Sequence, residues 1–169
     1  MRSPKKYTTQ TYTKRVDYTA GSHRLPQAMA EPAVCKICGD VYADRRWTLP
    51  EAQRAQQTRP TREVVCPACK RQADNLPSGY VYLVGAFLRQ HFTEITQLLQ
   101  NEAARAASDN PLARIMELTQ EGAEQLTITT TTEHLAQRLG HAVNKAYDGA
   151  VRYDFSHENK LARVYWRRD

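Results

Sequence analysis

The chain has no long hydrophobic run. Nowhere in its 169 residues does an apolar stretch approach the roughly 18 residues that a membrane-spanning helix needs. No hydrophobic signal segment follows Met1 either. These absences argue against membrane-spanning and secreted proteins, so we expect a cytoplasmic protein with no membrane partner.

Catalytic motifs are also absent. The sequence contains no nucleophile elbow, no phosphate-cradling glycine loop and no His-Glu-x-x-His. No pair of carboxylates stands out, and no histidine stands at a metal-ligand spacing. An enzyme would have to assemble its site from scattered residues, which a single sequence does not display. We therefore expect no enzyme, no catalytic residue and no small-molecule substrate.

Cysteine is scarce, and its arrangement is the most informative feature of the chain. The four cysteines, Cys35, Cys38, Cys66 and Cys69, form the pattern C-x2-C-x27-C-x2-C. Two thiols on one tight turn, occurring twice, suit tetrahedral zinc, and four thiolates leave no coordination position for water or substrate. Gly39 after Cys38 fits a turn that needs positive φ. The spacing predicts one structural Zn²⁺.

Two redox dithiols or two disulfides are the alternative interpretation of these cysteines. A redox C-x-x-C is expected beside a strand–helix unit of the thioredoxin type, and none precedes either pair. Cysteines reserved for a metal also agree with a reducing compartment. We therefore favour the metal site.

Positive charge is concentrated in the first half of the chain. The formal net charge is +6, with +4 in residues 1–34, +3 in residues 35–78 and −1 in residues 79–169. A basic balance of this size suggests a polyanionic partner, most often nucleic acid. The alternative is an ordinary basic protein without such a partner.

Composition divides the chain into three segments. Residues 1–32 have too few aliphatic side chains to form a core, which predicts a disordered basic arm. Residues 33–78 form the predicted zinc ribbon, which is too small to fold without its metal. Within it we expect a strand in 41–47, a helix from Pro50 to about Gln57, and a strand over 63–65. Residues 79–169 form the predicted α+β domain.

The α+β domain shows helical and strand periodicities in turn. The predicted elements are a strand over 80–88, a helix over about 89–106, a short helix opened by Pro111, a strand over 126–129, a helix capped by a box from Thr130 to Glu133 and ending near Tyr147, and a hairpin of strands 150–155 and 161–167. The fold class is therefore α+β: an N-terminal four-cysteine zinc ribbon followed by a small two-layer α/β sandwich of order β-α-α-β-α-β-β.

Cations beside aromatic rings mark the candidate RNA contacts, because rings stack on bases while Lys and Arg bind phosphates. In the arm and the ribbon the candidates are Lys5, Lys6, Lys14, Arg15, Arg45, Arg46, Trp47, Lys70 and Arg71. In the last hairpin, alternation puts Arg152, Arg163, Tyr165 and Arg167 on one face, and a sheet that shows Arg and Tyr is a common RNA platform. The alternative is a solvated outer face that binds nothing.

Several motifs resemble one family in particular. They are the paired C-x-x-C-G and C-P-x-C knuckles, Arg71 and Asp74 after the second, Pro77-Ser78-Gly79-Tyr80 before an apolar strand, and the segments 110–116, 128–131 and 134–140. Together they resemble the zinc-ribbon export adaptor for the large ribosomal subunit, specifically its short prokaryotic relatives. The chain is far shorter than the eukaryotic adaptor, so export is not implied. The resemblance implies contact with ribosomal RNA and ribosomal proteins, in assembly, hibernation or quality control.

These observations favour a cytoplasmic zinc-ribbon protein that binds RNA and associates with the ribosome. The alternative is a protein-interaction or regulatory adaptor in which the zinc site is purely structural.

Overall fold

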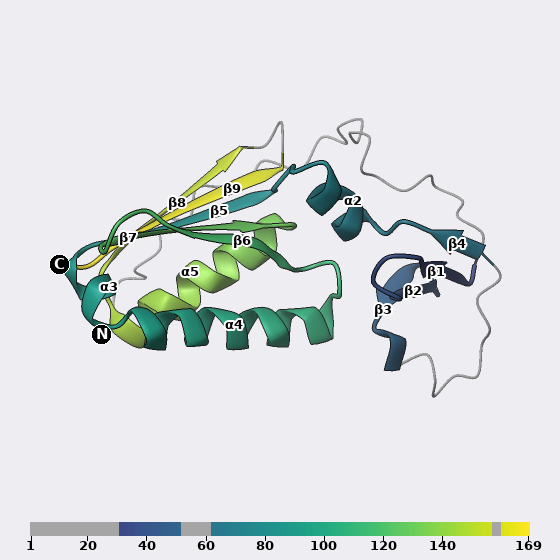
Figure 1. The fold of residues 1–169 in the computed structure, drawn as a ribbon, viewed down its shortest axis with the longest axis horizontal. Helices are drawn as coiled ribbons and strands as arrows, with labels where there is room; N and C mark the ends of the chain where they lie inside the picture. The colour runs from purple at the N-terminus through teal and green to yellow at the C-terminus, as the bar shows by residue number, and fades with distance from the viewer. Residues whose placement is uncertain (1–30, 52–61, 157–159) are drawn as a thin grey trace, which may run out of the picture.

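A computed structural model describes residues 31–51, 62–156 and 160–169. The predicted basic arm, with Lys5, Lys6, Lys14 and Arg15, lies outside the described residues except for Glu31 and Pro32. The described part contains two sheets and four helices, which confirms a mixed α+β protein (Figure 1). None of the helices in these ranges is both long and apolar enough to cross a membrane.

The first sheet belongs to the cysteine-containing part, which we call the ribbon (described residues up to 78). It consists of four three-residue strands in the order β3-β2-β1-β4: β1 (Ala33–Cys35), β2 (Val41–Ala43), β3 (Arg46–Thr48) and β4 (Arg62–Val64). The predicted single strand over 41–47 is wrong. The chain reverses at Asp44 and Arg45, whose φ angles of 52° and 61° suit a two-residue type I′ turn, so this segment forms two strands.

A helix that the sequence analysis did not predict follows the second cysteine pair. Helix α2 (Pro67–Ala73) has Cys66 as its N-cap and Pro67 at its first position, where the missing N–H of proline costs nothing. Residues 74–78 then connect α2 to the second sheet. Pro50 and Glu51 are helical, and the rest of the helix predicted there lies outside the described residues.

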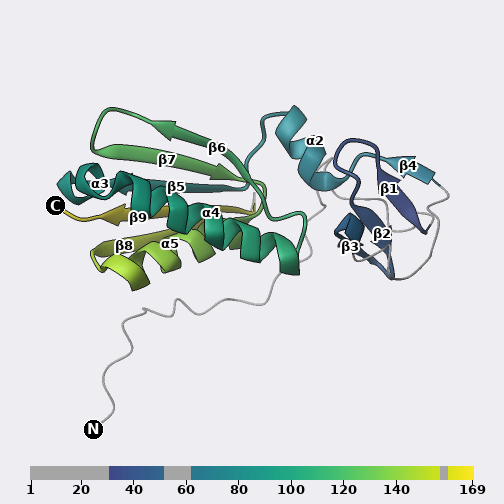
Figure 2. The ribbon, with the colours of Figure 1, turned by 60° about the horizontal axis from the view of Figure 1, so that its bottom comes forward.

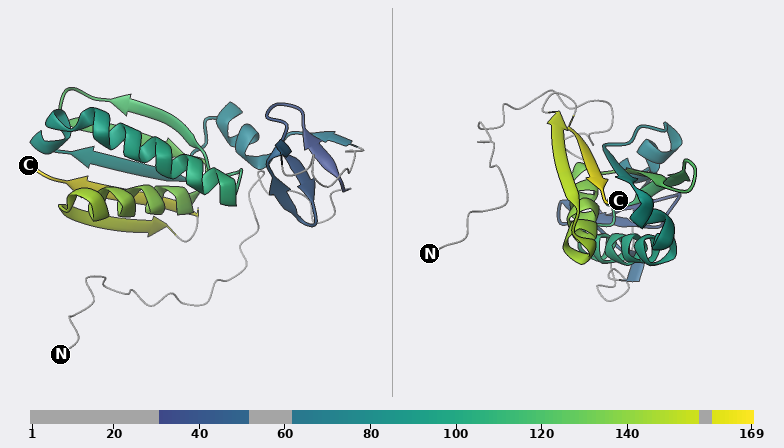
Figure 3. Two further views of the ribbon diagram at one scale, coloured as in Figure 1. Left: turned by 90° about the horizontal axis from the view of Figure 1, so that it is seen from below. Right: turned by 90° about the vertical axis from the view of Figure 1, so that its left-hand side faces the viewer.

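The second part of the chain, which we call the body (residues 79–169), is a five-stranded sheet with helices on one face (Figures 2 and 3). The strand order is β6-β7-β5-β9-β8, and only β5 and β9 run parallel. Its elements are β5 (Gly79–Val84), α3 (Ala86–Gln90), α4 (Phe92–Asp109), β6 (Ile115–Gln120), β7 (Gln125–Thr130), α5 (Glu133–Tyr147), β8 (Ala150–Ser156) and β9 (Leu161–Arg167).

The short helix predicted after Pro111 is wrong, because this segment forms strand β6. Leu112, Ile115 and Met116 have helical spacing, which produced the wrong prediction. Strand β6 lies at the edge of the sheet, and its last four residues are exposed. An edge strand packs few apolar side chains, so its sequence carries little of the alternation that identifies a strand.

Other boundaries also differ from the prediction. The helix predicted over about 89–106 corresponds to α4, which begins at Phe92 and ends at Asp109, and the separate helix α3 precedes it. The first strand of the body ends at Val84 rather than Leu88, because Gly85, with φ of 130°, turns the chain directly into α3. The predicted capping box at Thr130 is also wrong. Thr132 is the N-cap of α5, and its Oγ1 accepts a hydrogen bond from Leu135 N at 3.3 Å.

The core of the body lies between its sheet and helices α4 and α5. Val81 and Leu83 of β5 point into it, and so do Val164 and Trp166 of β9. Burial of each large apolar side chain contributes about 1.5–3 kcal/mol. The alternate residues of β5, Tyr80 and Tyr82, therefore lie on the sheet face that the helices leave open.

Helix α5 approaches the sheet closely at Gly140. A Cβ atom added there would overlap Val164 Cγ1 and lie 3.3 Å from Val164 Cβ. Replacing glycine by alanine inside an exposed helix normally stabilises it by about 1 kcal/mol. For Gly140→Ala we expect the opposite, a loss of about 1–3 kcal/mol in unfolding free energy, because the extra methyl forces α5 and β9 apart. Urea unfolding followed by circular dichroism measures the change.

Ala146→Gly provides the matched control, since Ala146 is exposed on the same helix. This variant measures the ordinary difference between the two residues in α5 without any contact with the sheet. Stabilisation by Gly140→Ala would contradict the close contact between α5 and β9.

Candidate metal centre and open sheet face

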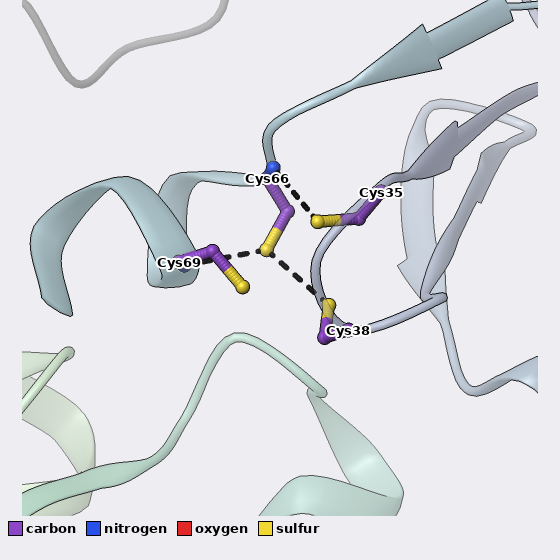
Figure 4. A group of neighbouring side chains, drawn as sticks. All are labelled: Cys35, Cys38, Cys66 and Cys69. Carbon is purple, nitrogen blue, oxygen red and sulfur yellow. Dashed lines mark hydrogen bonds between the residues drawn. The ribbon is translucent and has the colours of Figure 1, made fainter. Parts of the chain in front are cut away.

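The four cysteines meet in one cluster, as their spacing predicts. Cys35 ends β1, Cys38 follows in the next turn, and Cys66 and Cys69 lie at the start of α2. Figure 4 shows the four side chains converging, and their Sγ atoms all lie within 4.8 Å of one another. All four are free cysteines, so the predicted alternative of two disulfides does not describe this structure.

The sulfur positions fit a metal ion. Tetrahedral coordination with metal–sulfur bonds of about 2.3 Å places neighbouring sulfurs about 3.8 Å apart. The Sγ atoms of Cys38 and Cys66 are 3.7 Å apart. The cluster is therefore able to hold one metal ion through Cys35, Cys38, Cys66 and Cys69. Four protein ligands complete a tetrahedral sphere, which makes this a structural rather than a catalytic type of site.

Backbone N–H groups of the two turns point at the sulfurs. Cys66 N donates to Cys35 Sγ at 3.3 Å, and Cys69 N donates to Cys66 Sγ at 3.4 Å. Burial by itself would raise the pKa of the Cys35 thiol, but hydrogen bonds from backbone N–H groups lower this pKa to about 6. Burial raises the pKa of Cys38 to about 11 and also raises the pKa of Cys66. These backbone donors therefore favour the thiolate form of Cys35.

An arginine from the body contacts the cluster. Arg114, in the loop between α4 and β6, places Nη2 2.5 Å from Asp40 Oδ2 and Nη1 3.5 Å from Cys69 Sγ. Burial opposes the charge on Arg114, but the hydrogen bond to Cys38 and the negative charges of Asp40 and the sulfurs raise the guanidinium pKa overall. Neither Arg114 nor Asp40 was predicted as a site residue from the sequence, since no local pattern links residues so far apart.

Trp47 was predicted to contact RNA, and its burial contradicts that role. Its side chain belongs to the small apolar cluster of the ribbon with Cys35, Cys66 and Ala68, and the residue is only 7% exposed. Its ring lies 5.4 Å from that of Tyr42, centroid to centroid. Trp47 therefore stabilises the ribbon around the metal centre and presents no ring face for stacking on a base.

The predicted ribbon cations occupy different environments. Arg45 and Arg46 are exposed at the turn between β2 and β3. Lys70 and Arg71, in the last turn of α2, are partly buried, and Arg71 Nη1 donates to Leu76 O at 3.2 Å. Burial lowers the pKa of Arg71. Of these four residues, Arg45 and Arg46 are the ones fully available to a partner.

The open face of the body sheet carries a row of aromatic and basic side chains. Strand pairing sets Tyr82 of β5 beside Tyr165 of β9, and Tyr165 beside Arg152 of β8. The Tyr82 and Tyr165 rings are nearly parallel with centroids 5.0 Å apart, and Arg152 Cζ lies 4.5 Å from the Tyr165 centroid. Tyr80 extends the row, with its ring 6.1 Å from Tyr82.

Two more arginines belong to the same face. Arg163 pairs with Tyr80 across β5 and β9, and Arg167 pairs with Val84. We call the resulting surface the tyrosine face: Tyr80, Tyr82, Arg152, Arg163, Tyr165 and Arg167. The structure thus places the four predicted hairpin residues together and adds Tyr80 and Tyr82, which come from the strand predicted over 80–88. The alternation Tyr80-Val81-Tyr82-Leu83 is the sequence signal that could have found them.

Acidic residues at the tyrosine face offset only part of its positive charge. Asp154 pairs with Arg152 at 3.1 Å, and Asp169 pairs with Arg167 at 3.0 Å. Both pairs are largely exposed, so each contributes little to stability and can exchange partners. Beside the row lies a shallow, mostly apolar hollow of about 360 Å³, lined by Tyr82, Val84, Ala150, Val151, Arg152, Tyr165, Trp166 and Arg167.

Comparisons with protein-family models, with curated proteins and with solved structures find no match to this chain. The resemblance to the short prokaryotic relatives of the export adaptor therefore stays a prediction.

Proposed function

We propose that this chain is a zinc-stabilised RNA-binding protein whose tyrosine face holds single-stranded RNA. The observation that carries the proposal is the ladder of Tyr82, Tyr165 and Arg152 across three adjacent strands. Parallel rings at stacking distance beside a guanidinium form a surface on which unpaired bases can extend the stack. Base–aromatic stacking contributes about 1–3 kcal/mol per base.

Single strands suit this surface better than a duplex. Sheets recognise RNA through splayed bases, whereas the bases of a duplex are already stacked on one another. The hollow next to Tyr82 and Tyr165 provides an apolar recess at the end of the ladder, between Arg152 and Arg167. A nucleotide whose base enters this recess would keep its flanking phosphates within reach of the guanidinium groups of Arg152 and Arg167. On binding, these arginines would exchange Asp154 and Asp169 for phosphates.

The metal and the cellular setting follow from other observations. We assign zinc because four thiolates in a tetrahedral arrangement are its typical structural ligand set. The ribosomal character of the RNA, and the cytoplasmic setting, rest on the family resemblance and on the basic arm and ribbon. In this proposal the exposed Arg45 and Arg46, together with Lys5, Lys6, Lys14 and Arg15, bind further phosphates while the tyrosine face binds bases.

Salt dependence tests the proposal. Fluorescence anisotropy should show that labelled single-stranded RNA binds more tightly than a duplex of the same sequence. Each neutralised phosphate contributes about −0.7 to the log–log salt slope for a single strand. The double variant Arg152→Gln, Arg163→Gln should therefore make the slope less negative by about 1.4.

The matched control is Arg89→Gln combined with Arg105→Gln, two exposed arginines outside the tyrosine face. It removes the same charge and should leave most of the slope intact. An equal change in both double variants would show that net charge, and not the tyrosine face, determines binding. An RNA affinity that does not change with salt concentration would favour the alternative of a protein-interaction adaptor. Cosedimentation of the full chain with ribosomal particles tests the ribosomal assignment separately.

A further inference from the structure

The contact between Arg114 and the cysteine cluster joins the body to the ribbon. The backbone and the Nε atom of Arg114 are held by hydrogen bonds within the body, and the end of its side chain extends to the ribbon. Its backbone N donates to Thr131 Oγ1 at 2.8 Å, and its backbone O accepts from Thr131 N at 2.9 Å. Its Nε donates to Pro111 O at 2.8 Å. The guanidinium is thus aimed at the ribbon by fixed neighbours, so little conformational entropy remains to be lost in the contact.

On the ribbon side the guanidinium contacts Asp40, which lies next to the metal centre, and the ligand Cys69. Asp40 lies directly after the first knuckle, and its backbone O accepts from Cys35 N at 2.8 Å, so the carboxylate is held beside the sulfurs. Its side chain is buried, with 3% exposed. Cys69 Sγ is the second contact. One planar group with several donors can serve Asp40, Cys69 and Pro111 at once, which a lysine ammonium does not match.

Charge explains why a cation belongs at this place. A divalent ion held by four thiolates carries a formal net charge of about −2, and the buried Asp40 adds another negative charge beside it. Buried charges are tolerated when a partner compensates them. Groups that hydrogen-bond to metal ligands typically change metal affinity about 10- to 100-fold when removed. Arg114 occupies that position for this centre.

An apolar contact from the same loop accompanies the charge. Leu112, two residues before Arg114, packs against the ribbon cluster that includes Cys66 and Trp47. Both contacts reach the ribbon at its metal centre rather than at its outer strands. The body therefore contacts the part of the ribbon whose structure depends most on the metal.

We propose that Arg114 is a positioning residue of the metal centre, and that metal loading fixes the ribbon in one orientation against the body. Coupling of this kind is reciprocal. If the Arg114 contact tightens metal binding by some factor, the bound metal strengthens docking of the ribbon on the body by the same factor. The contact between ribbon and body at Arg114 does not depend on RNA binding.

The test compares the full chain with Arg114→Gln, Arg114→Lys and the control Arg105→Gln, which removes an exposed arginine of α4. Competition with a chelator of known zinc affinity gives the metal affinity of each protein. We expect Arg114→Gln to bind zinc about 10- to 100-fold more weakly than the parent. Arg114→Lys should lose less affinity, because it keeps the charge, and Arg105→Gln should lose none.

Residual dipolar couplings of the zinc-saturated proteins give the second readout, which an ordinary surface ion pair would not change. In the parent and in Arg105→Gln, one alignment tensor should fit the amides of ribbon and body together. In saturated Arg114→Gln, each part should need its own tensor. Should Arg114→Gln fail to fold, Arg114→Lys replaces it in both measurements. Zinc affinity within twofold of the control, or a single tensor in the saturated variant, would overturn the proposal.

Discussion

A chelator added to the metal-loaded protein is expected to unfold the ribbon and leave the body folded. The ribbon has strands of only three residues, and its buried apolar cluster consists largely of the cysteines themselves. Binding of structural zinc supplies about 10–16 kcal/mol in small cysteine-rich modules, which is more than such a cluster contributes. The body has a separate core between its sheet and helices, so it does not depend on the metal.

The two tryptophans of the chain report on the two parts separately. Trp47 lies in the ribbon cluster and Trp166 in the core of the body. Fluorine NMR of protein labelled with 5-fluorotryptophan should therefore show two signals. After chelation the Trp47 signal should move to the position found in urea, while the Trp166 signal stays where it was.

Cys66→Ser should have the same effect without a chelator, because it removes one of the four ligands. Ala73→Ser is the matched control, since it introduces the same residue at an exposed position of the same helix. An unchanged Trp47 signal in metal-free protein would show that the ribbon folds unaided. The structural role assigned to the metal would then be wrong.

Tyr82→Ala is expected to weaken binding of single-stranded RNA by roughly 5- to 150-fold. Tyr82 lies between Tyr80 and Tyr165 in the row, so its removal interrupts the ladder at its centre. The loss of stacking with one base is worth about 1–3 kcal/mol, and each 1.4 kcal/mol corresponds to about a factor of ten. Anisotropy titration with labelled RNA measures the change. Tyr82→Phe should bind like the parent, because the ring rather than the hydroxyl stacks.

Thr127→Ala is a control on the same face, since Thr127 pairs with Tyr82 across β5 and β7. It should leave RNA affinity unchanged. The Trp166 signal in every variant shows whether the body remains folded. Should Tyr82→Ala and Tyr165→Ala both bind RNA like the parent while reversal of Arg45 and Arg46 abolishes binding, the ribbon would be the RNA surface and the tyrosine face a solvated outer face.

Features encoded locally could be predicted from the sequence. The cysteine spacing predicted the metal cluster, and alternation in the last hairpin placed Arg163 and Tyr165 on one face. Gly39 has the positive φ, 81°, that its place after the first pair implied. In each case neighbouring residues along the chain carry the whole signal.

Features that depend on distant partners were missed. The alternation in β5 puts Tyr80 and Tyr82 on one face, but the ladder also needs Tyr165 of β9, and only the pairing of β5 with that distant strand brings the rings together. Arg114 and Asp40 are separated by 74 positions, and each alone resembles an ordinary surface charge. The prediction for the segment of β6 was wrong for a related reason. Its local pattern fits a helix, and only its pairing with β7 makes it a strand.

The parallel pairing of β5 with β9 also determines when the tyrosine face can exist during protein synthesis. Gly79 pairs with Ala162, so the two strands that carry the three tyrosines are joined late in translation. Local contacts of the ribbon and α4 can form first, whereas pairing over such a separation is slow and waits for the distal strand. A nascent chain that ends before Leu161 carries all four metal ligands and both tyrosines of β5, yet it lacks the ladder. The row of stacked rings is therefore complete only after β9 has been synthesised and has paired with β5.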